Sequence, residues 1–99
     1  MKEILKNFLD GNGVLTAFPA KRKMKLYALC YLAEKIGKDR VYSEAEINSL
    51  LCEWHSFGDP ATLRRELYTH CFINRSPDGS KYRREQELPS VEELEKNYC

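Results

Sequence analysis

Two adjacent arginines in the stretch "GDPATLRREL", Arg64 and Arg65, are well suited to bind an anion. Further basic residues cluster before and after them, at Lys21, Arg22, Lys23 and Lys25 and at Arg75, Lys81, Arg83 and Arg84. Lysine and arginine gathered on one surface bind the phosphates of nucleic acids, and arginine can also donate two hydrogen bonds to a guanine edge. Nucleic acid is therefore one candidate ligand.

The two arginines are not equivalent if this stretch is helical, because successive helical residues point about 100° apart. Leu63 and Leu67 have the spacing of a core-facing pair, which places Arg64 at the edge of the core and turns Arg65 outward. Carboxylates that could pair with Arg64 are those of Glu46, Glu53 and Asp59. We predict a structural role for Arg64 and a ligand contact for Arg65.

Cysteine and histidine offer two other chemistries. Cys52 and His55 have Cys-x-x-His spacing, and His70 adjoins Cys71, but structural zinc needs four ligands and adjacent side chains do not readily meet at one ion. A cysteine beside a histidine could also be a nucleophile with its base. Nucleophile elbows, phosphate loops and paired carboxylates are missing from the sequence, so we predict no metal site, no enzyme and no cofactor.

Charge is divided unequally along the 99 residues. The formal net charge is +1, but residues 85–99 carry −4, which leaves residues 1–84 at +5. A basic body with an acidic tail suits an anionic partner, although a solvated surface explains so small an excess almost as well. No apolar run approaches the roughly 20 residues that cross a membrane, and no signal peptide is visible. We predict one cytoplasmic domain, residues 1–99.

The cysteines fit that compartment. Cys30, Cys52 and Cys71 lie in apolar stretches without any Cys-x-x-Cys pair, which favours reduced, buried thiols. Cys99 is a terminal thiol and the exception.

Two helices are predicted in the N-terminal third. Apolar residues of "KEILKNFLD" recur at helical spacing, which indicates a short amphipathic helix over residues 2–10 that stops at "GNG". A longer helix is predicted over residues 20–36, with Gly37 as its stop. Its apolar face would consist of Leu26, Leu29, Cys30, Ala33 and Ile36.

Capping patterns place the remaining helices. After a short strand at residues 40–42, Ser43 and Glu46 have the spacing of a capping box. The helix that they begin would turn its apolar side to the core, namely Ile47, Leu50, Leu51 and Trp54. Asp59 caps the next helix, which has Pro60 at its first position and runs to about residue 71.

The C-terminal third combines strands and one more helix. "CFINR" and "SKYRR" have strand composition and are joined by the turn "SPDG", which predicts a β-hairpin. Ser90 and Glu93 repeat the capping-box spacing and predict a short helix over residues 90–98 in the acidic tail, residues 85–99.

From residue 20 onward the predicted order is helix, short strand, helix, helix and hairpin. This is the order of a winged helix-turn-helix domain, an α+β fold with a three-helix core and a hairpin wing; here the core is residues 14–84, with short extra helices at both ends. The helix that begins at residue 60 would be the recognition helix. The linker "HSFGD" is longer than the three- or four-residue turn of a standard helix-turn-helix.

Four ordered segments resemble a bacterial family catalogued as the domain of unknown function numbered 2087. They are "FPAKRKMKLYALCYLAEKI", "RVYSEAEINSLLCEWH", "DPATLRREL" and "INRSPDGSKYRR", and the resemblance spans roughly residues 8–84. It implies a winged-helix-like fold with a role in nucleic-acid binding. The chain departs from the family pattern at "THCF", where we expect a small residue or glycine near position 71.

Together these patterns predict a DNA-binding transcription regulator. The nucleic-acid contacts would be made by Lys21, Arg22, Lys23, Lys25, Thr62, Arg65, Thr69, Lys81 and Arg83. Structural roles are expected for Ser43, Glu46, Trp54, Asp59 and Arg64. The alternative is a winged-helix module for protein interaction without nucleic-acid affinity, since fold does not determine function. Residues 2–10 and 90–98 could form the seam of a homodimer, which would also let DNA be read at two half-sites.

Overall fold

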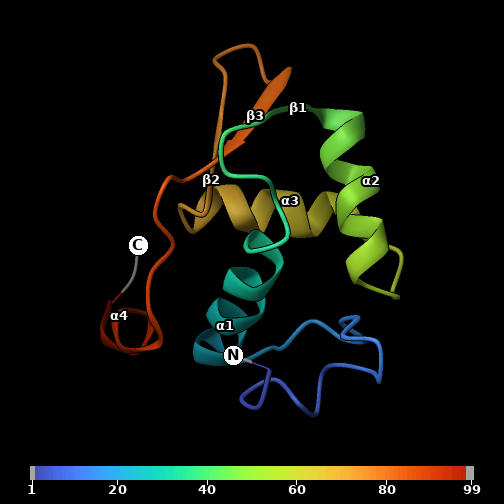
Figure 1. Ribbon diagram of the computed structural model, residues 1–99, viewed down its shortest axis with the longest axis vertical. Helices are drawn as coiled ribbons and strands as arrows, with labels where there is room; N and C mark the ends of the chain where they lie inside the picture. Colours follow the sequence, from blue (N-terminus) through green and yellow to red (C-terminus); the bar gives the residue numbers. More distant parts are fainter. Residues whose placement is uncertain (1, 98–99) are drawn as a thin grey trace.

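The computed structural model describes residues 2–97, which contain four helices and a three-stranded antiparallel sheet (Figure 1). In chain order the elements are α1 (Arg22–Ala33), β1 (Val41–Ser43), α2 (Glu44–Trp54), α3 (Pro60–Thr69), β2 (Ile73–Arg75), β3 (Lys81–Arg84) and α4 (Val91–Asn97). The predicted α+β class is confirmed. None of the helices in this part of the chain has the length and apolar character that crossing a bilayer requires.

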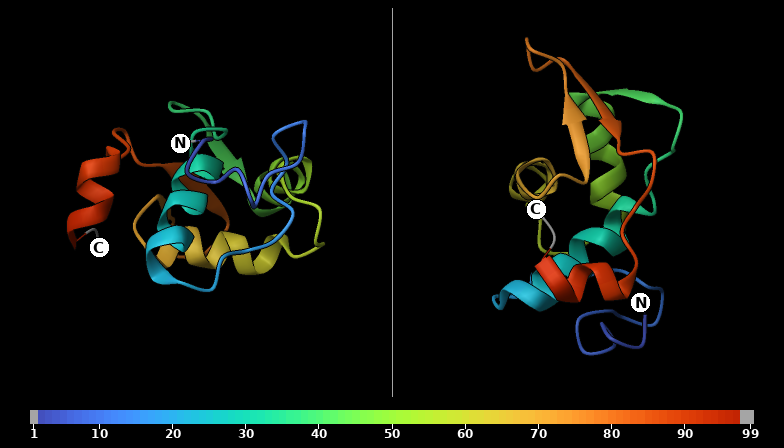
Figure 2. Two further views of the ribbon diagram at one scale, coloured as in Figure 1. Left: turned by 90° about the horizontal axis from the view of Figure 1, so that it is seen from below. Right: turned by 90° about the vertical axis from the view of Figure 1, so that its left-hand side faces the viewer.

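Strand β3 lies at the centre of the sheet, antiparallel to β1 on one side and to β2 on the other. The register places Tyr82 opposite both Tyr42 and Arg75, and the two tyrosines are buried. In the turn between β2 and β3, the carboxylate of Asp78 accepts hydrogen bonds from the amide and hydroxyl of Ser80 at 3.0 and 2.8 Å. The predicted hairpin is therefore confirmed, and it projects beyond the helices (Figure 2).

Helix α1 is buried on nearly every side from Leu26 to Ala33. Its predicted apolar face is buried, but so are the residues between those positions, Tyr27, Ala28, Tyr31 and Leu32. The helix is shorter than the predicted span of residues 20–36, because the chain continues from Ala33 to Ile36 in tight turns. A helix that packs through one face alone leaves the side chains of its other faces exposed. Because side chains all round α1 are buried, further segments must cover the helix.

The N-terminal segment is one such cover, and it is not the helix predicted over residues 2–10. It forms consecutive turns, in which the amide of Phe8 donates to the carbonyl of Leu5 at 2.7 Å. Leu5 is fully buried, and the carboxylate of Asp10 accepts two amides that follow it. The hydroxyl of Tyr31 donates to the carbonyl of Gly13 at 2.7 Å. A segment this short is not stable as a helix by itself, so these tertiary contacts decide its shape.

Helix α4 covers another side of α1. The predicted capping box is present: the amide of Ser90 donates to the Glu93 carboxylate at 3.1 Å, and the amide of Glu93 donates to the Ser90 hydroxyl at 3.3 Å. Leu94 is buried, and the Tyr27 hydroxyl donates to the Glu95 carboxylate at 2.7 Å. Helix α4, the described helical part of the acidic tail, therefore packs beside α1 (Figure 2). Residue 98 of the predicted helix lies outside the described residues.

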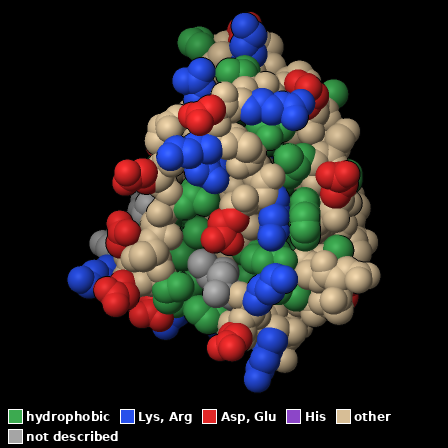
Figure 3. All heavy atoms as spheres, in the orientation of Figure 1, with side chains coloured by type: hydrophobic (Ala, Val, Ile, Leu, Met, Phe, Trp, Pro, Cys, Tyr) green, Lys and Arg blue, Asp and Glu red, His purple; other side chains and the backbone are tan. Residues whose placement is uncertain are grey.

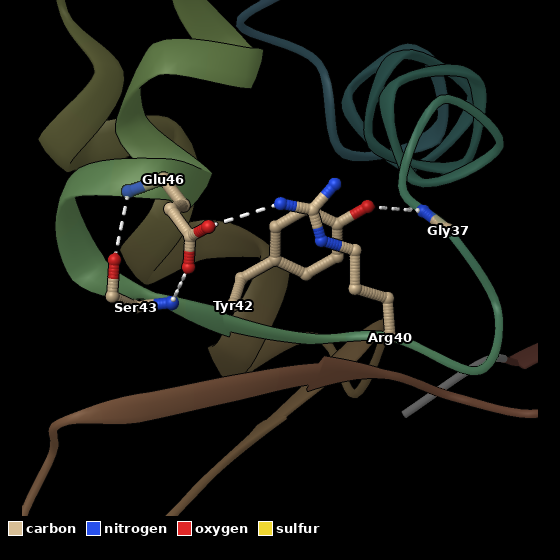
Figure 4. Close-up of polar contacts among 5 residues, drawn as sticks. All are labelled: Gly37, Arg40, Tyr42, Ser43 and Glu46. Carbon is tan, nitrogen blue, oxygen red and sulfur yellow. Dashed lines mark hydrogen bonds and ion pairs between the residues drawn. The ribbon is translucent and has the colours of Figure 1, made fainter.

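A capping box also begins α2, as predicted (Figure 4). The Ser43 hydroxyl accepts from the amide of Glu46 at 3.1 Å, and the amide of Ser43 donates to the Glu46 carboxylate at 2.9 Å. The guanidinium of Arg40 pairs with the same carboxylate at 2.9 Å and lies over the ring of Tyr42. These hydrogen bonds, first from Ser43 and then from Arg40, lower the pKa of Glu46.

Trp54, at the other end of α2, is half-buried against the core. Its carbonyl accepts the amide of Leu15 at 2.9 Å, and the ammonium of Lys35 lies 4.4 Å from the centre of its ring. Trp54 thus connects α2 both to the N-terminal segment and to the end of α1.

The cysteines correct one prediction. Cys30 is a buried free thiol, as expected, but Cys52 is an exposed free thiol, and Cys71 is exposed and disulfide-bonded. Apolar neighbours in the sequence did not reveal that Cys52 lies on the solvent side of α2. Cys99 lies outside the described residues.

Candidate nucleic-acid interface

The five residues between α2 and α3 fix the start of α3. His55 is buried there, with Nδ1 2.6 Å from the carbonyl of Leu51 and Nε2 accepting the amide of Asp59 at 2.9 Å. Asp59 accepts the amide of Thr62 at 3.2 Å, and Pro60 is the first helical residue. Hydrogen bonding from the side chain and then from the amide of Thr62 lowers the pKa of Asp59. The predicted cap is confirmed, and the His55 ring holds the long linker "HSFGD" in place.

Helix α3 ends at Thr69, two residues earlier than predicted, in a Schellman motif. The amide of Cys71 donates to the carbonyl of Tyr68 at 3.1 Å, and the amide of Phe72 donates to the carbonyl of Leu67 at 2.9 Å. Cys71 has φ 66°, in the left-handed region that this motif usually fills with glycine. The geometry explains why the family pattern leads to the expectation of a small residue or glycine at this position.

Between these ends, α3 buries Leu63 and Leu67 and turns a stripe of residues to solvent. The stripe consists of Ala61, Arg65, Tyr68 and Thr69. Two predicted contact residues, Arg65 and Thr69, therefore lie on the accessible side, whereas Thr62 is half-buried near the start of the helix. Tyr68 is 42% exposed. Tyr68 was not among the predicted contact residues, although its spacing of three from Arg65 places it on the same stripe.

Arg64 is held at the edge of the core. Its guanidinium pairs with the Glu44 carboxylate at 3.1 Å and donates a hydrogen bond to the side-chain oxygen of Asn48. It also lies 5.7 Å from the ring centre of Tyr82, and only 18% of its side chain is exposed. The side chain thus joins α3 to the first turns of α2 and to strand β3.

The partners predicted for Arg64 are wrong. Glu46 is occupied by the capping box and by Arg40 (Figure 4), and Asp59 caps α3. Among the described residues Glu53 forms no ion pair with Arg64 either. Glu44 takes their place because the first turn of α2 faces the middle of α3, a proximity that arises from helix packing rather than from sequence spacing.

A pocket of about 270 Å³ lies between α3 and the hairpin, and we call it the α3–hairpin pocket. Its lining consists of Glu44 from α2, of Ala61, Arg64, Arg65 and Tyr68 from α3, and of Arg75, Gly79 and Tyr82 from the hairpin. The guanidinium of Arg75 lies 4.7 Å from the ring centre of Tyr68. Arg75 was noted as basic but not predicted as a contact; its approach to α3 follows from its pairing opposite the buried Tyr82.

Lys81 and Arg83, two other predicted contacts, lie on the outer face of the sheet. Residues of β3 alternate between the faces, so these two exposed side chains point away from Tyr82 and from the pocket. Arg83 stands opposite Val41 and Asn74, which are also exposed. The basic residues of the hairpin are therefore divided between two surfaces.

The basic start of α1 lies next to acidic residues from two other helices. Lys25 pairs with Glu66 of α3 at 3.5 Å, and Lys23 pairs with Glu95 of α4 at 3.8 Å. Lys21 and Arg22 are exposed, and no side chain caps the helix at Lys21. The acidic tail thus offsets part of the charge that the sequence assigned to phosphate contacts.

The cysteine and histidine candidates are separated. Both ring nitrogens of His55 face backbone groups, whereas Cys52 points to solvent, and Nε2 of His70 lies 3.4 Å from the Glu66 carboxylate. Within residues 2–97, no group of three or more His, Cys, Asp or Glu side chains is placed to hold a metal ion.

Charges of both signs alternate over the face drawn in Figure 3. Acidic side chains gather at the lower left, where α4 lies in Figure 1, and lysine and arginine are frequent toward the hairpin at the top. On this face, positive charge is therefore concentrated toward the hairpin rather than spread as one continuous patch.

One known protein family matches the part of the chain that contains α1 to β3. The model of the family described as "Uncharacterized protein conserved in bacteria (DUF2087)" matches residues 14–84, which end at the last residue of β3. No curated protein and no solved structure matches the chain. Because the match covers more than half of the sequence and includes α1 to α3, both hairpin strands and β1, the chain belongs to the bacterial DUF2087 family.

Proposed function

We propose that this chain is a DNA-binding transcription regulator of the winged helix-turn-helix type. In this proposal α2 and α3 are the helix-turn-helix, α3 is the recognition helix, and the β2–β3 hairpin is the wing. The order of elements and the pairing of β1 with the hairpin support this arrangement. The observation that carries the proposal is the exposed stripe of α3, which presents Arg65 beside a pocket that also receives Arg75.

The residues divide into two roles. With α3 in the major groove, Thr69 would face base edges, and Arg65 would reach a phosphate that borders the groove. Thr62 would lie near the start of the helix, close to the phosphates. Lys81 and Arg83 on the outer face of the hairpin would contact phosphates. The start of α1 would add Lys21, Arg22, Lys23 and Lys25, with Glu66 and Glu95 weakening the contribution of the last two.

A protein-interaction module with the same fold is the second candidate. The ion pairs of Lys23 and Lys25 favour it, because paired cations offer less charge to a phosphate backbone. Tyr68 favours it as well, since exposed tyrosine is enriched in protein interfaces. Such a module would bind its partner through the same stripe of α3 and would have no affinity for DNA.

Fluorescence anisotropy with a labelled random-sequence duplex, at low and moderate salt, separates the candidates. Binding driven by phosphates must appear at low salt and weaken as salt rises. We expect Arg65→Gln to weaken binding and to lower the salt slope by about 0.9, the value for one lost phosphate contact. Lys38→Gln, which removes one exposed charge in the loop between α1 and β1, is the matched control and should bind like the parent chain. If the parent chain does not bind at low salt, the DNA proposal is overturned.

A further inference from the structure

The α3–hairpin pocket holds positive charge that the described residues do not neutralise. Arg64 is paired with Glu44, the acidic residue of the described lining. Arg65 and Arg75, by contrast, form no ion pair with any carboxylate in residues 2–97. The carboxylate of Asp59 is influenced by the charge of Arg65 but is engaged as the cap of α3. Two guanidinium charges therefore remain at one hollow of the surface.

Arg75 is oriented by its surroundings. Its guanidinium lies 4.7 Å from the ring centre of Tyr68, a cation–π arrangement that leaves its N–H groups free to donate. Gly79 of the hairpin turn forms another part of the wall and has φ 74°. A side chain at Gly79 would be strained, and its Cβ would lie 3.9 Å from Cδ of Arg75. The turn therefore keeps this side of the pocket free of side chains.

We propose that the α3–hairpin pocket is a phosphate-binding site, in which Arg65 and Arg75 donate hydrogen bonds to phosphate oxygens. Two guanidinium groups match the charge of a phosphate monoester, which is close to −2 at neutral pH. Their N–H groups can bind two oxygens of one phosphate in parallel, an arrangement that arginine favours. Tyr68 is a positioning residue that keeps Arg75 turned toward the pocket.

The phosphate can come from two sources. One is the backbone of a DNA duplex, in which case the inference rests on the proposed function and adds the contact that fixes α3 against the hairpin. The other is a free phosphate monoester such as a nucleotide. Both sources offer terminal phosphate oxygens to Arg65 and Arg75, two with one negative charge in the diester of the DNA backbone and three with nearly two charges in a monoester, so the experiment must include them separately.

The test is an NMR titration of the full chain, labelled with ¹⁵N, with inorganic phosphate, with adenosine monophosphate and with the random duplex. The side-chain Nε–H signals of Arg65 and Arg75 report on the pocket directly. Arg75→Gln is compared with Lys38→Gln, which removes one exposed positive charge from the loop between α1 and β1, outside every proposed contact. Thermal unfolding of both variants verifies that each is folded.

We expect phosphate or adenosine monophosphate to shift both arginine signals, and Arg75→Gln to weaken this binding about tenfold or more, as the loss of a charged hydrogen bond does. Lys38→Gln should bind phosphate like the parent chain. If neither phosphate compound nor the duplex shifts these signals, or if the two variants lose affinity for phosphate equally, the site is overturned.

The duplex distinguishes this inference from the proposed function. Release of bound phosphate by the duplex assigns the site to the DNA backbone. Binding of phosphate without any binding of duplex supports the site and overturns the DNA proposal. Binding of duplex, with the Arg65 and Arg75 signals unchanged by the duplex and by both phosphate compounds, supports the DNA proposal and overturns the site.

Discussion

Replacing Arg64 with alanine should lower the free energy of unfolding by about 2 kcal/mol, whereas Arg65→Ala should change it by less than about 0.5 kcal/mol. The charged hydrogen bond from Arg64 to Asn48 contributes about 1.5 kcal/mol, since only 18% of the arginine side chain is exposed. The ion pair with Glu44 adds less than about 1 kcal/mol, because 56% of the glutamate side chain is exposed to screening by solvent. Arg65 is exposed and forms no ion pair within residues 2–97, so little is lost with it.

Urea denaturation at neutral pH measures both changes, and thermal unfolding provides a second readout. A loss of about 2 kcal/mol corresponds to a decrease in Tm of roughly 8–16 °C for a domain of this size. Arg64→Met keeps the apolar part of the side chain and isolates the polar contacts. A double-mutant cycle with Asn48→Ala should give a coupling energy of about 1 kcal/mol. Equal losses for Arg64→Ala and Arg65→Ala would refute the division between an anchor and a contact residue.

Three further predictions concern other parts of the fold. Under reducing conditions, Cys71→Gly should be more stable than Cys71→Ala by about 1 kcal/mol in urea denaturation, because position 71 has a positive φ; equal stability would contradict the Schellman cap. Hydrogen bonds from the hydroxyl of Ser76 and then from Ser80 lower the pKa of Asp78 from 3.8 to about 2. Ionised Asp78 therefore stabilises the hairpin at pH values above 3.8, and this stabilisation is lost as the pH falls from 3.8 toward about 2. Asp78→Asn should therefore lower Tm at neutral pH and reduce the loss of Tm across that acid range, and an unchanged acid profile would speak against it. Burial raises the pKa of the Cys30 thiol to about 11, whereas Cys52 is an exposed free thiol. Iodoacetamide at mildly alkaline pH should therefore label Cys52 and spare Cys30, as peptide mapping would show. Labelling of Cys30 before Cys52 would show that α1 is not enclosed.

Elements with local signals were predictable because neighbouring residues satisfy them. The capping box of Ser43 and Glu46 and the cap at Asp59 need only a few residues of the same segment, and both are present. The same holds for the turn that closes the hairpin. Residues 2–10 show the limit of this reasoning. Helical spacing there indicated an amphipathic helix, but the segment forms turns that place Leu5 in the same core as α1, a tertiary contact that no local pattern contains.

The candidate site was predictable only where one helix determines it. Spacing within α3 separated Arg64 from Arg65, because the buried leucines orient the whole helix. The partner of Arg64 was missed, since Glu44 reaches it from another helix. The contact of Tyr68 with Arg75 also joins two elements, and it depends on the angle at which the hairpin meets α3. Long-range packing of this kind leaves no trace in residue spacing.

Because segments on both sides of the family match cover α1, the folded unit extends beyond residues 14–84. Leu5 and Leu94 lie outside the matched residues 14–84, yet both belong to the same core as α1. A chain trimmed to residues 14–84 would uncover apolar surface of α1 and become prone to self-association. The segments that precede and follow the family domain therefore pack against α1 and not against the exposed stripe of α3.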